Sequence, residues 1–156
     1  MKLITLFLLV GMLAVSGWAE NYSPEYVKKA EAGDAEAQFL LGNGYYYGHD
    51  GLTINYKEAV KWLAKSAEQG YTRARLNLGA CYYDGKGVVK NEKEGVKCWT
   101  KAAEEGDVDA QLELGLLYEN GRGVSKNINE AVKWYTKAAE QGDERAKKAL
   151  EMLKFK

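Results

Sequence analysis

Residues 110–142 read AQLELGLLYENGRGVSKNINEAVKWYTKAAEQG, and two earlier stretches of the 156-residue chain repeat this pattern. The copies end at Gly70, Gly106 and Gly142, which are 36 residues apart, and Gly33 precedes the first of them by 37 residues. Self-similarity at a fixed period of this length is typical of a repeat array. The internal period therefore decides the architecture before any single residue does.

Each copy holds two segments with helical periodicity. In the first segment, apolar residues recur at i, i+4 and i+8, as at Ala110, Leu114 and Tyr118. The second starts at an asparagine followed three residues later by a glutamate, as at Asn127 and Glu130. This spacing predicts a capping box, in which the asparagine side chain accepts from an early backbone N–H and the glutamate reaches back. We therefore expect first helices from about residues 34, 71 and 107, and second helices from 55, 91 and 127, each pair ending at a glycine.

Glycine also recurs inside each first helix, at positions 42, 79 and 115. Glycine there costs about 1 kcal/mol relative to alanine, so we expect another helix to approach closely at this point. In the last, partial copy the matching residue is Glu151, and Lys148 stands where the third copy has Leu112. Charge at both positions predicts that the final helix caps the array.

The copies share the pattern Ala-x-x-x-Leu-Gly-x-x-Tyr-x-x-Gly-x-Gly-Val-x-x-Asn-x-x-x-Ala-Val-Lys-Trp-Tyr-x-Lys-Ala-Ala-x-x-Gly, which resembles the Sel1-like repeat, a relative of the tetratricopeptide repeat. The resemblance covers about residues 23–156 and implies an all-α solenoid of antiparallel helix pairs, with three repeats plus capping helices. Within a repeat domain over 33–156, we expect repeats at about 33–69, 70–105 and 106–141 and a terminal capping helix over 142–156. A short N-terminal capping helix is expected over 20–32. The sequence departs from the family pattern at Asn55, Asn91 and Asn127, where Asp is commoner, and at Cys98, which replaces a Trp.

Residues 1–19 read as an export signal. Lys2 supplies a positive charge, Leu3–Val15 is apolar, and small residues at Gly17 and Ala19 precede a cut before Glu20, with a cut after Ser16 as the alternative. Thirteen apolar residues are fewer than the ~20 that a spanning helix needs. We therefore expect a signal peptide that is removed, no membrane insertion after cleavage, and a periplasmic or secreted chain.

Composition excludes several classes of function. The 22 basic and 22 acidic side chains leave no net charge, so the positive patch of a nucleic-acid-binding protein is not expected. The sequence contains one histidine, His49, and neither a phosphate loop nor a dinucleotide fingerprint. Two cysteines without a histidine partner do not form a metal site. We expect a monomeric protein that is not an enzyme and holds no cofactor or metal.

Cys81 and Cys98 fall in the two helices of one repeat, at nearly equal distances from the intervening turn. Export would permit a disulfide between them. Two reduced thiols packed as small apolar groups are equally compatible with the sequence. Both states stay open at this point.

The resemblance implies binding of a protein or peptide partner on the concave face, which the first helices of tetratricopeptide-like stacks line. The positions that would face it are Phe39, Asn43, Tyr46, Arg73, Leu76, Tyr83, Asp109, Leu112, Leu116 and Glu119. The alternative is that these apolar residues only pack between repeats. The leading hypothesis is an exported, non-catalytic scaffold. Two further hypotheses are a host-interacting secreted factor and a β-lactam-binding, β-lactam-hydrolysing or cell-wall-related activity, as credited to cysteine-rich relatives with a cysteine pair in every repeat.

Overall fold

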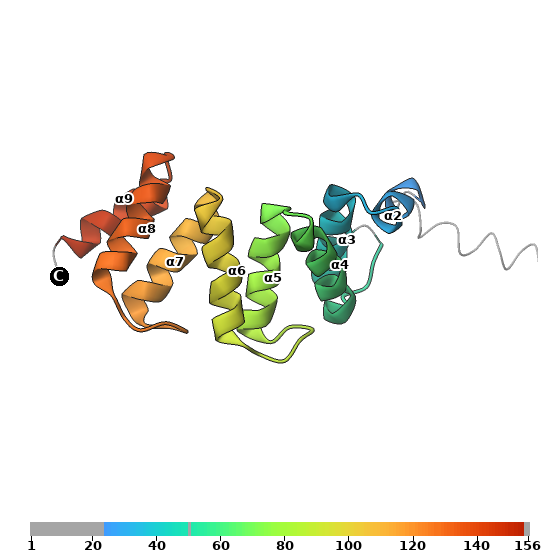
Figure 1. Ribbon diagram of the computed structural model, residues 1–156, viewed down its shortest axis with the longest axis horizontal. Coiled ribbons are helices and arrows are strands. Elements are labelled where there is room, and N and C mark those ends of the chain that lie inside the picture. The colour runs from blue at the N-terminus through green and yellow to red at the C-terminus, as the bar shows by residue number, and fades with distance from the viewer. Residues whose placement is uncertain (1–23, 50, 155–156) are drawn as a thin grey trace, which may run out of the picture.

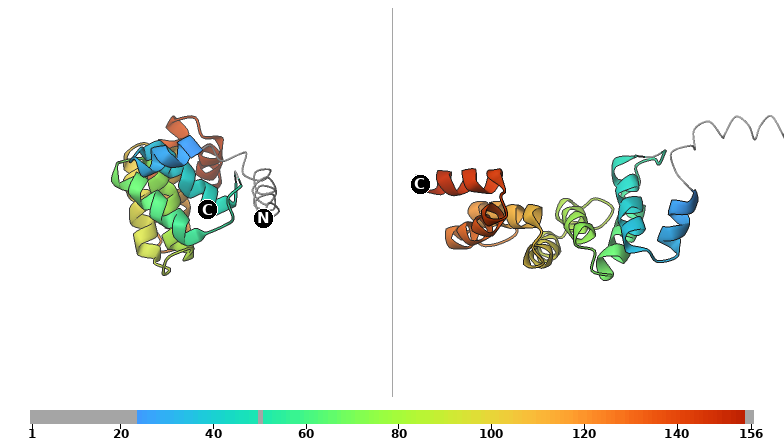
Figure 2. Two further views of the ribbon diagram at one scale, coloured as in Figure 1. Left: turned by 90° about the vertical axis from the view of Figure 1, so that its right-hand side faces the viewer. Right: turned by 90° about the horizontal axis from the view of Figure 1, so that it is seen from above.

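The computed structural model describes residues 24–49 and 51–154 and forms eight α-helices over those ranges. Their bounds are α2 Pro24–Glu31, α3 Ala35–Tyr47, α4 Tyr56–Glu68, α5 Thr72–Asp84, α6 Glu92–Glu104, α7 Val108–Asn120, α8 Ile128–Glu140 and α9 Glu144–Leu153. The helices follow one another along the long axis in chain order, as Figures 1 and 2 show. The expected all-α solenoid of helix pairs is confirmed. The expected signal at 1–19 lies outside the described residues and stays a prediction.

Side chains at the predicted positions cap the second helices. Asn55, Asn91 and Asn127 each accept a hydrogen bond at 3.2 Å from the backbone N–H three residues later. The other half of the predicted capping box is wrong. The Asn55 N–H donates to the carbonyl of Tyr45 at 2.8 Å, and the Glu58 carboxylate accepts from Lys61. The same two departures recur in the second and third repeats.

The glycines inside the first helices lie where the second helix of the same pair crosses. A Cβ built at Gly42 would lie 2.8 Å from Leu63 Cγ, and one at Gly115 would lie 2.3 Å from Tyr135 Cε1. Real Cβ atoms do not approach neighbours this closely. The predicted close approach is therefore confirmed, and it explains why a poor helix former occupies the middle of each first helix.

The core forms between successive repeats as well as within them. One cluster joins Val96 and Trp99 of α6 to Leu114 and Leu117 of α7 and to Trp134 of α8. Another joins Leu112 of α7 to α8 and α9. Each first helix thus buries residues against the preceding second helix and against its own partner.

The last helix has one buried and one charged face. Ala146 and Ala149 pack against the α7–α8 pair, whereas Lys148 and Glu151 are exposed. This is the arrangement expected of a helix that ends an array.

A polar pair joins the first helix of each repeat to the C-terminal end of its second helix. Gln69 donates to Gln38 at 2.8 Å, and Gln141 donates to Gln111 at 2.9 Å. In the middle repeat the equivalent residues are Arg75 and Glu105, which form a salt bridge. The same junction is therefore held by amides in two copies and by opposite charges in one.

Both cysteines are free thiols in the structure. Cys81 packs with Phe39 and Leu63 of the preceding repeat, and burial raises its pKa to about 11. Burial also raises the pKa of Cys98. Because Cys81 packs toward the preceding pair of helices, the disulfide that the sequence left open is not formed here.

Among the helices of the described ranges, none has the length and apolar character needed to cross a membrane.

Candidate functional site

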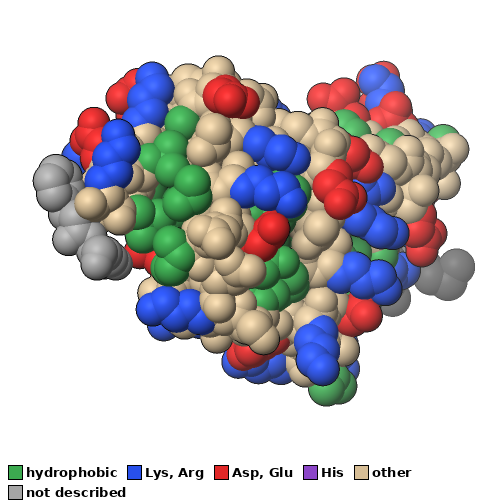
Figure 3. Space-filling model, turned by 60° about the vertical axis from the view of Figure 1, so that its left-hand side comes forward, with side chains coloured by type: hydrophobic (Ala, Val, Ile, Leu, Met, Phe, Trp, Pro, Cys, Tyr) green, Lys and Arg blue, Asp and Glu red, His purple; other side chains and the backbone are tan. Residues whose placement is uncertain are grey.

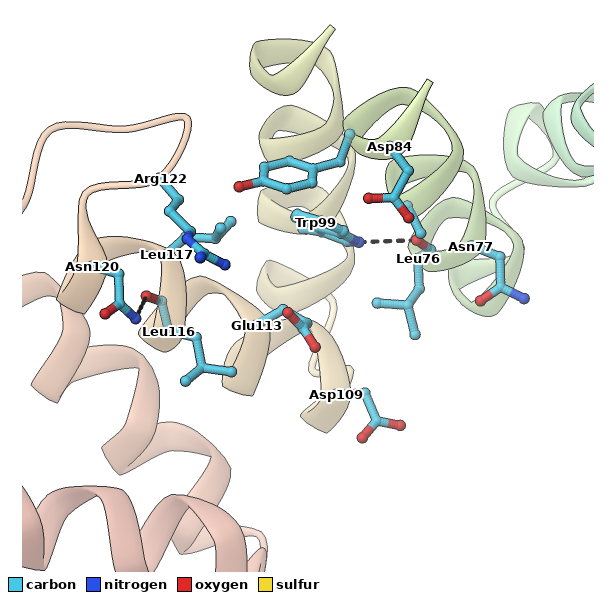
Figure 4. Close-up of a pocket in the computed structure, with 12 residues that line it drawn as sticks. Leu76, Asn77, Asp84, Trp99, Asp109, Glu113, Leu116, Leu117, Asn120 and Arg122 are labelled. Carbon is cyan, nitrogen blue, oxygen red and sulfur yellow. Dashed lines mark hydrogen bonds between the residues drawn. The ribbon is translucent and has the colours of Figure 1, made fainter. Parts of the chain in front are cut away.

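A groove of about 520 Å³ runs between α5 and α7, with α6 beneath it (Figure 4). It is lined by Leu76, Asn77, Ala80, Tyr83, Asp84, Trp99, Asp109, Glu113, Leu116, Leu117, Asn120 and Arg122. The lining combines apolar side chains with three carboxylates and one guanidinium. Concave sites of this size, mainly apolar with a few polar groups, are typical binding sites.

Trp99 forms the floor of the groove. Its indole N–H donates to the Leu76 carbonyl at 3.0 Å, and its ring lies 5.1 Å from the Tyr83 ring. The side chain is only 5% exposed. Trp99 therefore supports the groove and holds α5 and α6 together at this point.

The middle repeat differs from its neighbours in where it carries its tryptophan. In the other two repeats Trp62 and Trp134 lie beneath lysines, each 4.4 Å from the Nζ of Lys65 or Lys137. Cys98 occupies their position in the middle repeat, and Trp99 follows it. One residue turns a helix by about 100°, so the indole moves from beneath the lysines to the groove.

Gly95 accommodates this change. It stands where the other repeats have Ala59 and Ala131. A Cβ there would lie 2.8 Å from the Gly79 carbonyl oxygen and 2.9 Å from Tyr83 Cβ. The missing methyl group lets α5 and α6 approach closely and places Tyr83 beside Trp99.

The three groove carboxylates have different surroundings. Asp109 pairs with Arg145 of α9 at 2.6 Å, and the Asp84 carboxylate lies 3.9 Å from Lys86. The Glu113 carboxylate makes no hydrogen bond or ion pair with any other residue of the part of the chain that the structure describes. Burial raises the pKa of Glu113, the Asp109 carboxylate raises it further, and Arg145 lowers it. Glu113 is thus a partly buried carboxylate with unused acceptor capacity.

Four of the residues proposed from the sequence line the groove: Leu76, Tyr83, Asp109 and Leu116. Four others are polar or amphipathic residues outside it. Asn43 accepts from Asn77 at 2.7 Å, Tyr46 accepts from Lys86 at 2.8 Å, Glu119 accepts from the Tyr135 hydroxyl at 2.8 Å, and Arg73 is exposed on α5.

Phe39 and Leu112 are wrongly assigned to an exposed groove. Each is only 8% exposed and packs in a core cluster, Phe39 with α4 and α5 and Leu112 with α8 and α9. On α7 the lining residues are Asp109, Glu113, Leu116, Leu117 and Asn120. The sequence-based stripe chose Leu112 and Glu119 in place of Glu113 and Asn120, one residue too early at both positions.

The signal that could have located the stripe is polarity. Glu113 and Asn120 are polar residues among the apolar residues of this helix, and a helix buried on two sides carries most of its exposed polar residues on the remaining face. In the sequence alone, the alignment of Leu112 with Phe39 and Leu76 favours a different face of the helix, so polarity does not decide between them.

We also searched the described residues for metal sites, for a reactive environment of the histidine and for large charged patches. Over 24–49 and 51–154, no three His, Cys, Asp or Glu side chains gather in a way that could hold a metal ion. His49 is exposed, and its ring lies edge-on to Tyr47 at 5.3 Å. On the face that Figure 3 draws, acidic and basic side chains alternate with hydrophobic patches, with no large area of one charge.

Sel1 repeats are recognised at residues 35–71, 72–107 and 108–143, which is most of the chain. The chain belongs to the Sel1 repeat family. Sel1 repeats commonly form protein-binding scaffolds and are generally non-catalytic. The three recognised repeats match the α3–α4, α5–α6 and α7–α8 pairs, so the groove lies between the second and third repeats.

Solved structures of Sel1 repeat proteins are similar to this chain. A Sel1 repeat protein from Oxalobacter formigenes is 44% identical with a TM-score of 0.72, over 81% of this chain and 95% of that one. The protein c5321, a protective antigen present in uropathogenic Escherichia coli strains that displays an SLR fold, is 40% identical with a TM-score of 0.74, over 78% of this chain and 26% of that one. Helicobacter pylori cysteine rich protein B is 29% identical with a TM-score of 0.64, over 81% of this chain and 90% of that one.

Among curated proteins, an F-box protein of Arabidopsis thaliana, At1g70590, is 45% identical over 56 residues. The match spans 36% of this chain and 15% of the plant protein. This chain therefore corresponds to a small part of that relative and to about a quarter of c5321.

Proposed function

We propose that this Sel1 repeat protein is an exported, non-catalytic scaffold that binds a peptide segment of a partner protein in the groove between α5 and α7. The observation that supports this most directly is the exposed apolar surface within the groove. Leu116 is 40% exposed there and lies close to the partly exposed Leu76 and Tyr83. Large amphipathic and apolar side chains in a concave site are typical of residues that contribute most to binding.

An elongated ligand fits this surface better than a compact one. Leu40 of α3 stands at the position of Asn77 in the next repeat, and Tyr47 stands at the position of Asp84. Both Leu40 and Tyr47 are exposed apolar residues. The first helices of successive repeats thus present equivalent exposed positions along the stack, which favours a segment that runs across several helices.

Capture of the partner tests the proposal. A photoreactive amino acid at Leu116 is expected to crosslink a partner in living cells, whereas one at Val132 is not. Val132 is a matched control because it is an apolar residue of α8, 37% exposed and absent from the groove lining. Leu116→Asp should abolish capture, and Val132→Asp should retain it. Equal capture by both variants would show that the partner binds elsewhere.

Leu112 and Leu116 provide a second matched comparison, one turn apart on α7. We expect Leu112→Ala to lower the free energy of unfolding by about 2–4 kcal/mol, because it leaves a cavity in the core. Leu116→Ala should change it by less than about 0.5 kcal/mol while weakening partner capture. Urea denaturation and the crosslinking assay measure the two effects separately. A large loss of stability in Leu116→Ala would contradict its placement in the groove.

Export rests on the composition of residues 1–19 and has its own test. Mass spectrometry of the protein recovered outside the cytoplasm should give a chain that starts at Glu20, or at Gly17 if cleavage follows Ser16. Recovery of a cytoplasmic chain that still begins at Met1 would contradict export. That result would not bear on peptide binding in the groove, which the crosslinking experiment tests independently.

A further inference from the structure

We infer that the groove selects an arginine side chain of the bound peptide, with Glu113 as its counter-charge. This inference rests on the proposed peptide binding and adds the chemical group that the groove recognises. It follows from the position of one unpaired carboxylate among apolar groove residues.

Glu113 lies one helical turn after Asp109 on the groove face of α7 (Figure 4). Its carboxylate has no hydrogen-bond or ion-pair partner elsewhere in residues 24–49 or 51–154. A charged group that is partly removed from water without a partner is costly to the free protein. A ligand that supplies hydrogen-bond donors and a positive charge at this point would offset that cost.

The cations near Glu113 are paired with other groups, so the positive charge that pairs with Glu113 would come from the ligand. Arg145 is the cation that acts on Glu113, but it already binds Asp109 and Asp143, each at 2.6 Å. Arg122 lies beyond the C-terminal end of α7 and acts on Tyr83. Asp109 and Asp84 have cationic neighbours within the protein. Glu113 is therefore the groove carboxylate whose two oxygens remain open to a ligand.

Arginine fits this arrangement better than other charged side chains. Its guanidinium is planar and donates two parallel N–H groups to one carboxylate, which lysine cannot do. Its three methylene groups pack on apolar surface while the charged end stays polar, and Leu76 and Leu116 supply such surface in the groove. An acidic or phosphorylated segment would meet three carboxylates against one guanidinium.

The test compares short blocked peptides with one central residue between two leucines. The central residue is arginine, lysine or citrulline, which has nearly the shape of arginine without the charge. Binding is followed by NMR through the indole N–H of Trp99 on the groove floor. The indole N–H signals of Trp62 and Trp134, beneath the lysines of α4 and α8, serve as internal references.

We expect the arginine peptide to shift the Trp99 signal and to bind about tenfold more tightly than the citrulline peptide, with lysine between them. Glu113→Gln should bring the ratio of arginine to citrulline affinity close to one, mainly by weakening binding of the arginine peptide. Glu140→Gln, on an exposed part of α8, is the matched control and should keep the tenfold ratio.

The outcomes separate this inference from the proposed function. If all three peptides shift Trp99 with equal affinity, the groove binds peptides and the selection of arginine is overturned. If the ratio survives in Glu113→Gln, arginine selection by this carboxylate is overturned. If no peptide shifts Trp99 at millimolar concentration and the partner crosslinks away from Leu116, both the inference and the proposed function are overturned.

Discussion

At the scale of single residues, Gly115 shows how one absent methyl group fixes the distance between two helices. The ring of Tyr135 occupies the space that a side chain at this position would need. Tyr135 is fully buried and its hydroxyl donates to Glu119 of the same α7 helix. Tyr135 of α8 therefore contacts α7 twice, through its ring at Gly115 and through its hydroxyl at Glu119.

Gly115→Ala should destabilise the protein although alanine is the better helix former. The new Cβ would lie 2.3 Å from the Tyr135 ring, and overpacking of this kind costs about 1–3 kcal/mol. That cost outweighs the gain of about 1 kcal/mol in helix propensity. Urea denaturation should show a smaller loss for Gly42→Ala, where the neighbour is the flexible Leu63 side chain. A variant as stable as the wild type would mean that Tyr135 moves aside at no cost.

Glu113→Gln should stabilise the free protein at neutral pH. Burial raises the pKa of Glu113 in the folded state, so the folded protein holds this proton to a higher pH than the unfolded chain does. The free energy of unfolding from this group then falls as pH rises from the ordinary glutamate range through the raised pKa. Thermal unfolding should show an advantage of the variant at pH 7 that shrinks toward about pH 4. An advantage independent of pH would contradict this assignment.

At the scale of helices, the sequence predicts boundaries better than faces. The second helices start after Asn55, Asn91 and Asn127 as expected, because side-chain capping is a local property. The groove stripe on α7 was misplaced because this helix packs on α6 on one side and on α8 on the other. Apolar residues therefore occupy most of its circumference, and periodicity alone does not distinguish the remaining face.

The role of Trp99 as the floor of the groove was also not predicted from the sequence. The repeat alignment places Cys98 opposite Trp62 and Trp134, and Trp99 opposite Leu63 and Tyr135. The packing adds that Leu63, Trp99 and Tyr135 each contact the glycine in the middle of the partner helix. The resemblance to tetratricopeptide-like stacks predicted four of the groove residues but not Trp99, which forms the floor.

The ion pair between the two helices of the middle repeat gives a prediction at the same scale. The Arg75 side chain is 15% exposed, so Glu105→Gln should remove the counter-charge of a largely buried guanidinium. We expect a loss of about 1–2 kcal/mol in the free energy of unfolding. Adding Arg75→Gln should recover most of it, because the double variant rebuilds the amide pair seen at Gln38–Gln69 and Gln111–Gln141.

A double-mutant cycle in urea measures this coupling. The Arg75→Gln single variant completes the cycle and should lose less than Glu105→Gln, because Glu105 is more exposed and keeps its hydrogen bond from Thr72. Additive losses in the double variant would contradict the equivalence of the two kinds of pair.

At the scale of the whole molecule, every core cluster joins neighbouring helices and none joins distant ones within the described ranges. Stability in such a stack is approximately a sum of repeat and interface contributions. Within the described ranges, α2 and α9 each pack against the neighbouring repeat on one side. At α9 the charged residues Lys148 and Glu151 cover the open side.

Lys148→Leu combined with Glu151→Gly should make the protein self-associate. These changes give α9 the residues that α7 has at Leu112 and Gly115, where another helix packs. An apolar, open end of a repeat stack favours association with a second molecule. Size-exclusion chromatography should show a concentration-dependent shift that the Glu151→Gly control lacks. A monomeric double variant at high concentration would show that charge at these positions is dispensable.

The unusual middle repeat has a consequence for how reliably the chain finds its fold. Three similar copies can pair wrongly during folding, because a first helix from one copy resembles those of the others. Arg75 pairs with Glu105, whereas Gln69 or Gln141 would leave its charge without a counter-charge. Gly95 lets α6 approach the Gly79 carbonyl of α5, where Ala59 or Ala131 of another copy would place a methyl group. These features of residues 72–107 therefore disfavour pairing of either helix of the middle repeat with a helix of another copy.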